Sequence, residues 1–393
     1  MKRPSDPRLT LEHWLAAAPA IGAADALVRA CALADARAAA LGPDWEARRP
    51  QLLATLDLIR ELGVGAEAMA GAIVHALIEC GLSAADPELA ALPADVRNLV
   101  EGQQAAERVW SLYAARGSTG GTEGLRRLLL AIIRDLRVVF ILLARQLVQM
   151  RAAASRPDEE RRALAQLTAD IHAPLANRLG IWQLKWELED LAFRYLQPDV
   201  YKRIAHLLDE RRGDRESWIA ESRTMLEDAL AKAGIKADIA GRPKHIYSIW
   251  RKMQKKGVEF SDLYDVRALR ILVDDIANCY AALGVVHSLW AYIPGEFDDY
   301  IASPKGNQYQ SLHTAVVGPH GKTLEVQIRT HEMHRRAELG FAAHWRYKEG
   351  GGADASFERK ISGTRQLLGS KDAREDDAAL VAGVRTEVIE ERV

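Results

Sequence analysis

The spacing of apolar residues changes once along this chain, and that change limits the folds open to it. From residue 11 to about residue 200, Ala, Leu, Arg and Glu dominate, and apolar residues recur every three or four positions. This spacing places them on one face of a helix, and no series of strands and turns interrupts it. We therefore expect an all-helical first half. Its predicted helices include 67–80, 123–153, 158–180 and 182–197.

Short alternating segments separated by Gly, Pro and Asp follow a charged helix predicted at 215–233. The pattern predicts strands at 237–240, 266–273, 311–317 and 323–329, and helices at 244–256, 276–290 and 331–348. The sequence GPHGK at 318–322 suits a hairpin turn between the last two strands. The predicted fold class is therefore α+β, with an all-helical domain followed by a mixed β-sheet flanked by helices.

Length and composition narrow the class of protein. The chain has 393 residues, more than the roughly 250–300 at which single cores stop growing, so we expect two domains. Its 53 Lys and Arg balance 54 Asp and Glu, which argues against stable nucleic-acid binding over a whole face. No apolar run approaches the roughly 18 residues of a spanning helix, and no signal peptide follows the N-terminal charges. A cytoplasmic location without membrane contact is expected.

The densest chemical signal is the segment GRPKHIYSIWRKMQKK at 241–256, which carries six positive charges and no acidic residue. Arg242 and Lys244 lie where a predicted strand ends and a predicted helix begins. Cationic side chains and a helix N-terminus could converge there on a polyphosphate. The alternative is an ordinary solvated helix face.

Two carboxylates lie on predicted strands that could be neighbours. Asp265 opens the strand DVRALRILV, and Glu325 lies within TLEVQIR, where it shares a face with Gln327 and Arg329. Two carboxylates on adjacent strands can hold Mg²⁺, which takes oxygen ligands and bridges substrate phosphates. The alternative is an exposed amphipathic strand.

A polar segment at 295–314 is too long to be a simple turn. It offers Lys305 for a phosphate, Tyr309 for stacking, and amide or imidazole groups for hydrogen bonds to a base. A purine pocket needs this combination of a flat aromatic face and adaptable polar groups. The polar groups are Asn307, Gln310 and His313. The alternative is a surface loop with one buried tyrosine.

Together these segments resemble the RelA/SpoT family of long alarmone synthetases, closely so over residues 165–350. The matching motifs are HAPLANRLGIWQLKWELEDLAF, GRPKHIYSIWRKMQKK, DVRALRI, EFDDYIASPK, NQYQSLHT, EVQIRT and AELGFAAHWRYK. The resemblance implies a helical HD-type domain at 1–198, a nucleotidyltransferase-like (p)ppGpp synthetase domain at 199–350, and a linker at 351–393.

The resemblance implies a reaction in which the β,γ-pyrophosphoryl group of ATP moves to the ribose 3′-hydroxyl of GDP or GTP, releasing AMP. Asp265 would bind Mg²⁺, and Glu325 would activate the 3′-hydroxyl or share the metal. Residues implied for ATP are Arg242, Lys244, Ser248 and Lys252. Residues implied for GDP or GTP are Asp298, Lys305, Asn307, Tyr309, Gln310 and His313.

One departure suggests a subtype. Bifunctional members carry a basic RxKD-type segment where this chain has the acidic Glu296–Tyr300, as the monofunctional, RelA-like branch does. Asp298 would replace a lysine near the acceptor, which implies a stronger need for Mg²⁺ and a shifted preference between GDP and GTP. The alternative is that Asp298 and Asp299 merely cap a loop.

The helical half resembles the family's HD-type hydrolase domain, which removes the 3′-pyrophosphate with manganese held by His and Asp ligands. Here the HDxxED signature has become His75-Ala76-Leu77-Ile78-Glu79-Cys80, and Arg145 stands where the last ligand aspartate belongs. We expect a lone His75 to hold a divalent cation poorly and Arg145 to repel one. The prediction is a hydrolase-dead domain that scaffolds or restrains the synthetase.

Long members of the family continue into modules that engage ribosome and tRNA in the stringent response. This chain stops about where those modules would begin, so we expect an N-terminal catalytic fragment that meets ribosome and tRNA only through the missing region. Three alternatives remain: a bifunctional synthetase–hydrolase, a nucleotidyltransferase acting on RNA ends, and a catalytically silent nucleotide-binding regulator.

Overall fold

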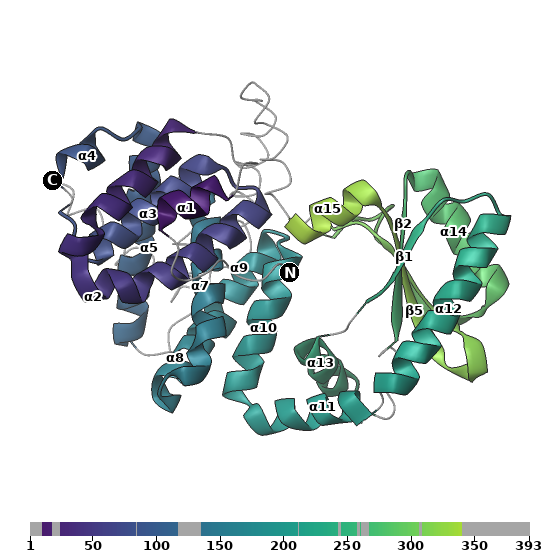
Figure 1. The fold of residues 1–393 in the computed structure, drawn as a ribbon. Helices are drawn as coiled ribbons and strands as arrows, with labels where there is room; N and C mark the ends of the chain where they lie inside the picture. Colours follow the sequence, from purple (N-terminus) through teal and green to yellow (C-terminus); the bar gives the residue numbers. More distant parts are fainter. Residues whose placement is uncertain are drawn as a thin grey trace, which may run out of the picture. The chain divides into compact units, whose positions relative to one another are not determined.

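The computed structural model of this chain describes residues 10–17, 24–83, 85–116, 135–210, 212–242, 245–257, 260, 267–305 and 309–339. These residues fall into two compact units, one ending at Ala153 and the other beginning at Ala154 (Figure 1). The domain boundary predicted at residue 198 falls inside the second unit, and as a division between functional domains it stays a prediction. The predicted loop at 117–124 lies outside the described residues.

The first unit is all-helical where it is described, as predicted. Its helices are α1 (Leu11–Ala16), α2 (Asp25–Leu62), α3 (Ala66–Glu79), α4 (Pro87–Ala90), α5 (Ala94–Arg116) and α7 (Arg137–Ala152). Helix α2 breaks at Gly42, whose φ of 63° is left-handed and which precedes Pro43. The segment Arg137–Ser155 is long and apolar enough to cross a membrane, but 67% of it is buried inside the protein, as is typical of a core helix.

The second unit begins with further helices. They are α8 (Asp158–Leu167), a π-helical turn (Thr168–His172), α9 (Ala173–Arg178), α10 (Trp182–Leu196), α11 (Pro198–Glu210) and α12 (Arg212–Lys232). The helices predicted at 158–180 and 182–197 are therefore present, the first of them divided by the π turn. Later helices are α13 (Ile246–Lys256), α14 (Ile276–Leu289) and α15 (His331–Leu339).

A five-stranded mixed sheet follows, in the order β1-β2-β5-β4-β3. Its strands are β1 (Asp238–Gly241), β2 (Ala268–Val273), β3 (Ala291–Asp299), β4 (Leu312–Val317) and β5 (Thr323–Thr330). Strands β2 and β5 are parallel and the other neighbours antiparallel, which confirms the mixed sheet and the hairpin at 318–322. The interpretation of 295–314 as one long loop is wrong in its first part, because residues 295–299 belong to edge strand β3.

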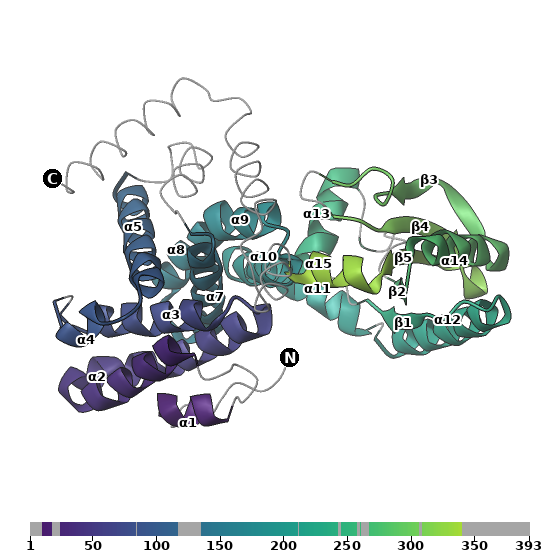
Figure 2. The same ribbon diagram turned by 90° about the horizontal axis from the view of Figure 1, so that it is seen from above.

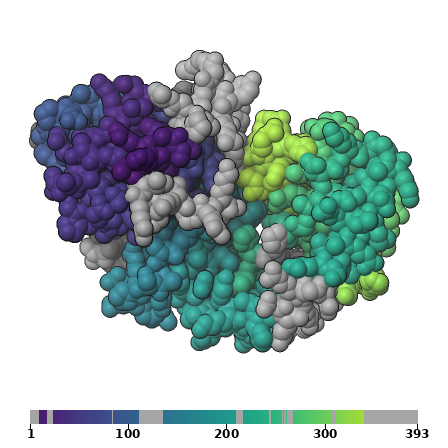
Figure 3. Space-filling view, in the orientation of Figure 1, coloured from purple at the N-terminus to yellow at the C-terminus, as the bar shows by residue number. Residues whose placement is uncertain are grey.

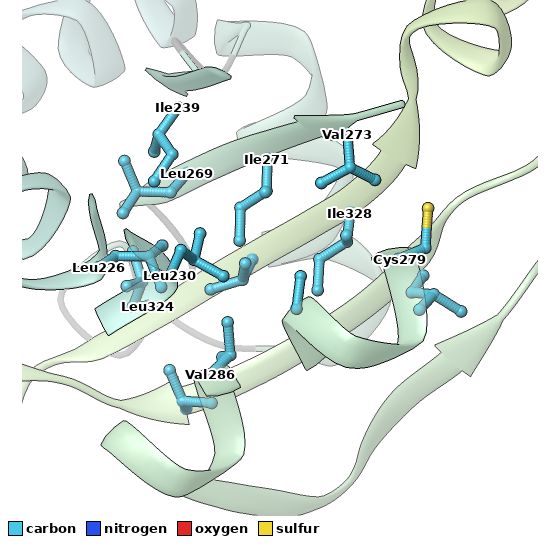
Figure 4. Close-up of a cluster of buried hydrophobic side chains, with 14 of the residues drawn as sticks. Leu226, Leu230, Ile239, Leu269, Ile271, Val273, Cys279, Val286, Leu324 and Ile328 are labelled. Carbon is cyan, nitrogen blue, oxygen red and sulfur yellow. The ribbon is translucent and has the colours of Figure 1, made fainter. Parts of the chain in front are cut away.

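The two faces of the sheet differ in chemistry. One face carries the apolar core, where α12 and α14 pack against β1, β2 and β5 (Figure 4). Figures 1 and 2 place α12 and α14 on this side and α13 and α15 on the other. Helix α12 faces the viewer, so helices form most of the visible surface of this unit in Figure 3. The face toward α13 and α15 bears the polar residues of the strands.

Candidate active site

Four polar side chains form a row across the polar face of the sheet. The strand register places Arg270 on β2 opposite Gln327 on β5, Gln327 opposite His313 on β4, and His313 opposite Asp298 on β3. Since side chains alternate between faces, this row lies opposite the apolar core. The candidate site is built around it.

Glu325 lies on the same face, two residues before Gln327 on β5. Its neighbours across the ladders are Ala268 on β2 and Ala315 on β4, whose methyl side chains leave space around the carboxylate. The Gln327 amide donates to Glu325 Oε1 at 2.7 Å, and Arg242 Nη1 lies 3.8 Å from the same oxygen. The alternation predicted for β5 is confirmed. Its polar side is largely buried, with Gln327 only 2% exposed.

The residues predicted to bind ATP divide between two places. Arg242 directly follows β1, as predicted, and its guanidinium lies beside Glu325 and 4.9 Å from the ring centre of Trp186. Ser248 and Lys252 on α13 line a cavity of about 420 Å³. The same cavity is lined by Tyr247, Arg251 and Lys255 of α13 and by Lys185 and Glu189 of α10. Lys244 and Asp265 lie outside the described residues.

The start of α13 has a partner that the sequence did not reveal. Asp190 of α10 accepts a hydrogen bond from the backbone N–H of Tyr247 at 2.8 Å. Burial raises the pKa of Asp190, against the opposing effect of the backbone N–H groups of Tyr247 and Ile246. A carboxylate from α10 therefore interacts with the helix N-terminus that we expected to face a polyphosphate.

Tyr309 lies in a cluster of rings with His313 and Tyr300. Its hydroxyl oxygen is 2.9 Å from His313 Nε2, and its ring is edge-on to Trp182, Tyr300 and His313. Lys305 Nζ lies 4.1 Å from the ring centre of Tyr300 and 5.5 Å from that of Tyr309. Lys305, Tyr309 and His313 are thus brought together, as a purine and phosphate site requires.

The other residues predicted for this nucleotide behave differently. Asn307 lies outside the described residues. The Gln310 amide donates to the Ile301 carbonyl, and Gln310 lines a different cavity, of about 540 Å³, near the ends of β2 and β5. Its role in reading a base stays a prediction.

His313 links the two parts of the site. Burial, more than any neighbour, lowers its pKa to about 4, and the charges that act on it are Glu325, Arg242, Lys305 and Asp298. The ring is therefore neutral at pH 7. Asp298 faces this ring across the β3–β4 ladder, whereas Asp299 accepts from the backbone N–H of Ile301 and Ala302 and caps the turn after β3. The alternative given above, that these aspartates cap a loop, therefore applies to Asp299.

A second charged cluster closes the far end of the row. Glu338 of α15 lies 3.1 Å from Arg329 and 3.5 Å from Arg270, and His334 Nδ1 lies 2.6 Å from Arg329. Burial lowers the pKa of Arg270 to about 10 and that of His334 to about 4. Whether α15 contributes to the site was left open by the sequence. Its contacts place it against the arginines of this face.

The degenerate hydrolase motif lies in the first unit. His75 and Glu79 lie on α3, Ala76 is buried beside them, and Cys80 is the C-cap of that helix. The description of His75 as isolated is wrong: within the described residues, His75, Glu79 and Glu107 have ligand atoms within 4.8 Å of one another. Glu107 comes from α5, and no sequence motif marked it.

Arg145 of α7 fills this cluster with a guanidinium group. Its Nη1 lies 3.2 Å from His75 Nδ1, and its Nη2 donates to Glu107 Oε1 at 2.6 Å. Arg48 also pairs with Glu79. Burial lowers the pKa of His75, so the neutral ring accepts from Arg145 at Nδ1 and donates from Nε2 to Glu107, 3.2 Å away. The three groups that could ligate a metal are thus bonded to cations and to one another in this structure.

Comparison with known proteins finds two family models that match parts of this chain. The family model described as "Region found in RelA / SpoT proteins" matches residues 241–352, and the model described as "HD domain" matches residues 30–182. A "GTP pyrophosphokinase" of Photobacterium angustum is 46% identical over 344 residues, which is 86% of this chain and 46% of that protein. The chain thus carries the region found in RelA / SpoT proteins at 241–352 and is similar to GTP pyrophosphokinases. It spans about half the length of the curated relatives it matches.

Two further proteins are similar to this chain. A "Probable guanosine-3′,5′-bis(diphosphate) 3′-pyrophosphohydrolase" of Synechocystis is 42% identical over 347 residues, 87% of this chain and 45% of that protein. Among solved structures, small alarmone synthetase 1 from Bacillus subtilis bound to pppGpp is 20% identical and covers 42% of this chain and 94% of that chain. Its TM-score is 0.30, too low to bear on the ligands of this chain.

Proposed function

We propose that this chain is a (p)ppGpp synthetase that transfers the β,γ-pyrophosphoryl group of ATP to the ribose 3′-hydroxyl of GDP or GTP and releases AMP. The observation that carries the proposal is the position of His313, which lies opposite Asp298 on β3 and Gln327 on β5. Its Nε2 is 2.9 Å from the Tyr309 hydroxyl oxygen, and the charges that act on its ring are those of Glu325, Arg242, Lys305 and Asp298. Groups suited to a donor triphosphate and to an acceptor nucleotide thus meet at one ring.

In this proposal the protein works by positioning and by charge. Arg242, Ser248 and Lys252 hold the ATP phosphates, and Tyr309 with Lys305 holds the acceptor nucleotide. Glu325 accepts a hydrogen bond from the Gln327 amide and lies 3.8 Å from Arg242, and its strand neighbours are two alanines. Such an arrangement can receive the proton of an attacking hydroxyl.

The family uses a divalent metal, and we propose that it is Mg²⁺. Within the described residues, Glu325 offers carboxylate oxygen, the ligand type that a hard cation takes, on a face where its strand neighbours are alanines. Glu325, together with Asp265, would hold it. When bound, Mg²⁺ would neutralise charge on the transferring phosphoryl oxygens.

We further propose the monofunctional, RelA-like subtype. Asp298 lies opposite His313 and acts on the Lys305 charge, so a carboxylate replaces the lysine of bifunctional members beside the acceptor. It would increase the need for Mg²⁺ and shift the preference between GDP and GTP.

The first unit is proposed to be inactive as a hydrolase and to serve as a scaffold. What supports this is the guanidinium of Arg145, which engages His75 and Glu107. The opposing observations are the hydrolase-named relative and the three clustered ligand groups. Incubating the protein with ppGpp and Mn²⁺ decides between the two interpretations. Release of GDP and pyrophosphate would show hydrolase activity and support a bifunctional enzyme.

The decisive experiment mixes the chain with labelled ATP, GDP or GTP, and Mg²⁺, then resolves the nucleotides. A guanosine product carrying a 3′-pyrophosphate, with AMP in equal amount, is expected; no such product at high enzyme concentration would refute the proposal in favour of a silent regulator. Incorporation of AMP into RNA would indicate an RNA-end transferase. Glu325→Gln should abolish turnover while nucleotide binding persists, and continued turnover would remove Glu325 from the mechanism.

Location and larger partners follow the same proposal. ATP and guanine nucleotides are cytoplasmic, so we place the protein there. Contacts with ribosome and tRNA would need the region that the curated relatives have and this chain does not span.

A further inference from the structure

Helix α10 contacts both halves of the candidate site, although it precedes the matched RelA/SpoT region at 241–352. It belongs to the same compact unit as the sheet and touches α13 and α15. Two tryptophans, Trp182 and Trp186, lie one turn apart on it, with ring centres separated by 5.8 Å. Each is half-buried against a different residue of the site.

Trp182 contacts the residue proposed as the guanine platform. Its ring meets Tyr309 edge-on, with 5.5 Å between ring centres and 68° between ring planes. Edge-to-face pairs at this separation are attractive and fix ring orientation. Tyr300 and His313 contact the same tyrosine from other sides. Trp182 therefore completes the set of rings that holds Tyr309 in place.

Trp186 contacts the residues that flank the ATP side. The Arg242 guanidinium lies 4.9 Å from its ring centre, and His245 stacks on it at 5.5 Å with 25° between planes. A planar guanidinium on an indole face is a favoured cation–π arrangement, and it orients the guanidinium. Four residues further along α10, Asp190 binds the start of α13, and Glu189 lines the cavity of Ser248 and Lys252.

We propose that α10 is part of the synthetase site and that its two tryptophans are positioning residues with divided roles. Trp182 orients Tyr309 for the guanine nucleotide, and Trp186 orients Arg242 for ATP. The assignment of nucleotides rests on the function proposed above. The inference adds to the site a helix that lies before the matched region at 241–352.

The test measures KM for GDP and KM for ATP in variants of each tryptophan. Trp182→Leu keeps an apolar side chain but removes the flat ring, and it should raise KM for GDP roughly 3- to 10-fold while KM for ATP and kcat change less than about twofold. Trp186→Leu should do the reverse. Trp182→Phe and Trp186→Phe should restore most of each loss. Gln183→Ala, between the two tryptophans on the same helix, is the matched control and should leave both constants unchanged.

A merely structural role for α10 predicts a different result. If both leucine variants raised both KM values alike, or if neither value moved, the proposal would be overturned. Should the wild-type chain make no product, the proposed function fails but the inference remains testable. In that case Trp182→Leu should weaken equilibrium binding of GDP, and Trp186→Leu should weaken that of a non-hydrolysable ATP analogue. An equal loss of affinity for both ligands would refute the inference.

Discussion

Removing the Arg145 guanidinium should destabilise the first unit by an amount that the structure allows us to bound. Arg145 donates to Glu107 and to His75, joining α7 to α5 and α3. Although burial opposes it, the hydrogen bond to His75 and the Arg145 charge lower the pKa of Glu107 from 4.5 to about 2. That depression corresponds to roughly 3 kcal/mol. Because Glu107 keeps 32% exposure and shares its partners, we assign about 2 kcal/mol to Arg145.

The pH dependence of this effect has a defined sign. Since the folded-state pKa of Glu107 lies below its unfolded value, its contribution to stability is complete above about pH 4.5 and is lost as the pH falls toward 2. Arg145→Ala should therefore be most damaging near pH 7. The difference from wild type should shrink in strongly acidic solution, where Glu107 is protonated in both proteins.

Hydrogen exchange on the full chain measures this locally. In Arg145→Ala, amides of α3, α5 and α7 should exchange roughly 30-fold faster at pH 7, since about 1.4 kcal/mol is a factor of ten. Amides of α12 and α14 in the second unit provide the internal control. Arg145→Lys keeps the charge but not the two-pronged geometry, and it should lie between wild type and alanine. Unchanged exchange in those three helices would show that the guanidinium does not hold them together.

Three further outcomes are expected. Gln327→Leu should lower kcat about 10-fold with little effect on KM, because a hydrogen bond to the charged Glu325 is lost; a kcat within twofold of wild type would contradict this. Asp190→Asn should weaken the start of α13 by about 1 kcal/mol, seen as faster exchange in its first turn, whereas unaltered protection would count against the contact. The His313 ring should remain neutral in the folded protein down to about pH 5, as followed by NMR. The free energy of unfolding should fall as the pH drops from 6.5 toward 4, because in that range only the unfolded chain binds a proton at His313. An NMR midpoint near pH 6.5 would show that the ring is not buried.

Most of the sheet was predicted from the alternation of apolar and polar residues along each strand. It worked for β2, β4 and β5 because each has a core face whose apolar residues recur at every second position. It failed for β3, an edge strand whose side chains are almost all exposed and whose register shifts between Tyr292 and Phe297. A strand without a buried face leaves no alternation to detect.

The candidate site was predictable where its residues sit in one motif. Gln327 could have been found, since it shares a strand face with Glu325 two positions away. Three other residues could not have been found: Asp190, Trp182 and Trp186. They lie on a helix more than fifty residues before β2, and a sequence pattern does not show which distant segments come into contact in the fold. Glu107 was missed for the same reason: it reaches His75 from a neighbouring helix.

The position of β5 in the chain has a consequence for biosynthesis. This strand lies between β2 and β4 in the sheet, yet it is the last strand to be synthesised. Until residues 323–330 leave the ribosome, β2 can pair only with β1 and β4 only with β3, so the two halves of the sheet are not joined. The long loop closure between β2 and β5 further delays their pairing. Glu325 arrives with that same strand. A nascent chain therefore acquires Glu325 and the strand that joins the two halves of its sheet in one step. Under the proposed function, an unfinished polypeptide should make no product.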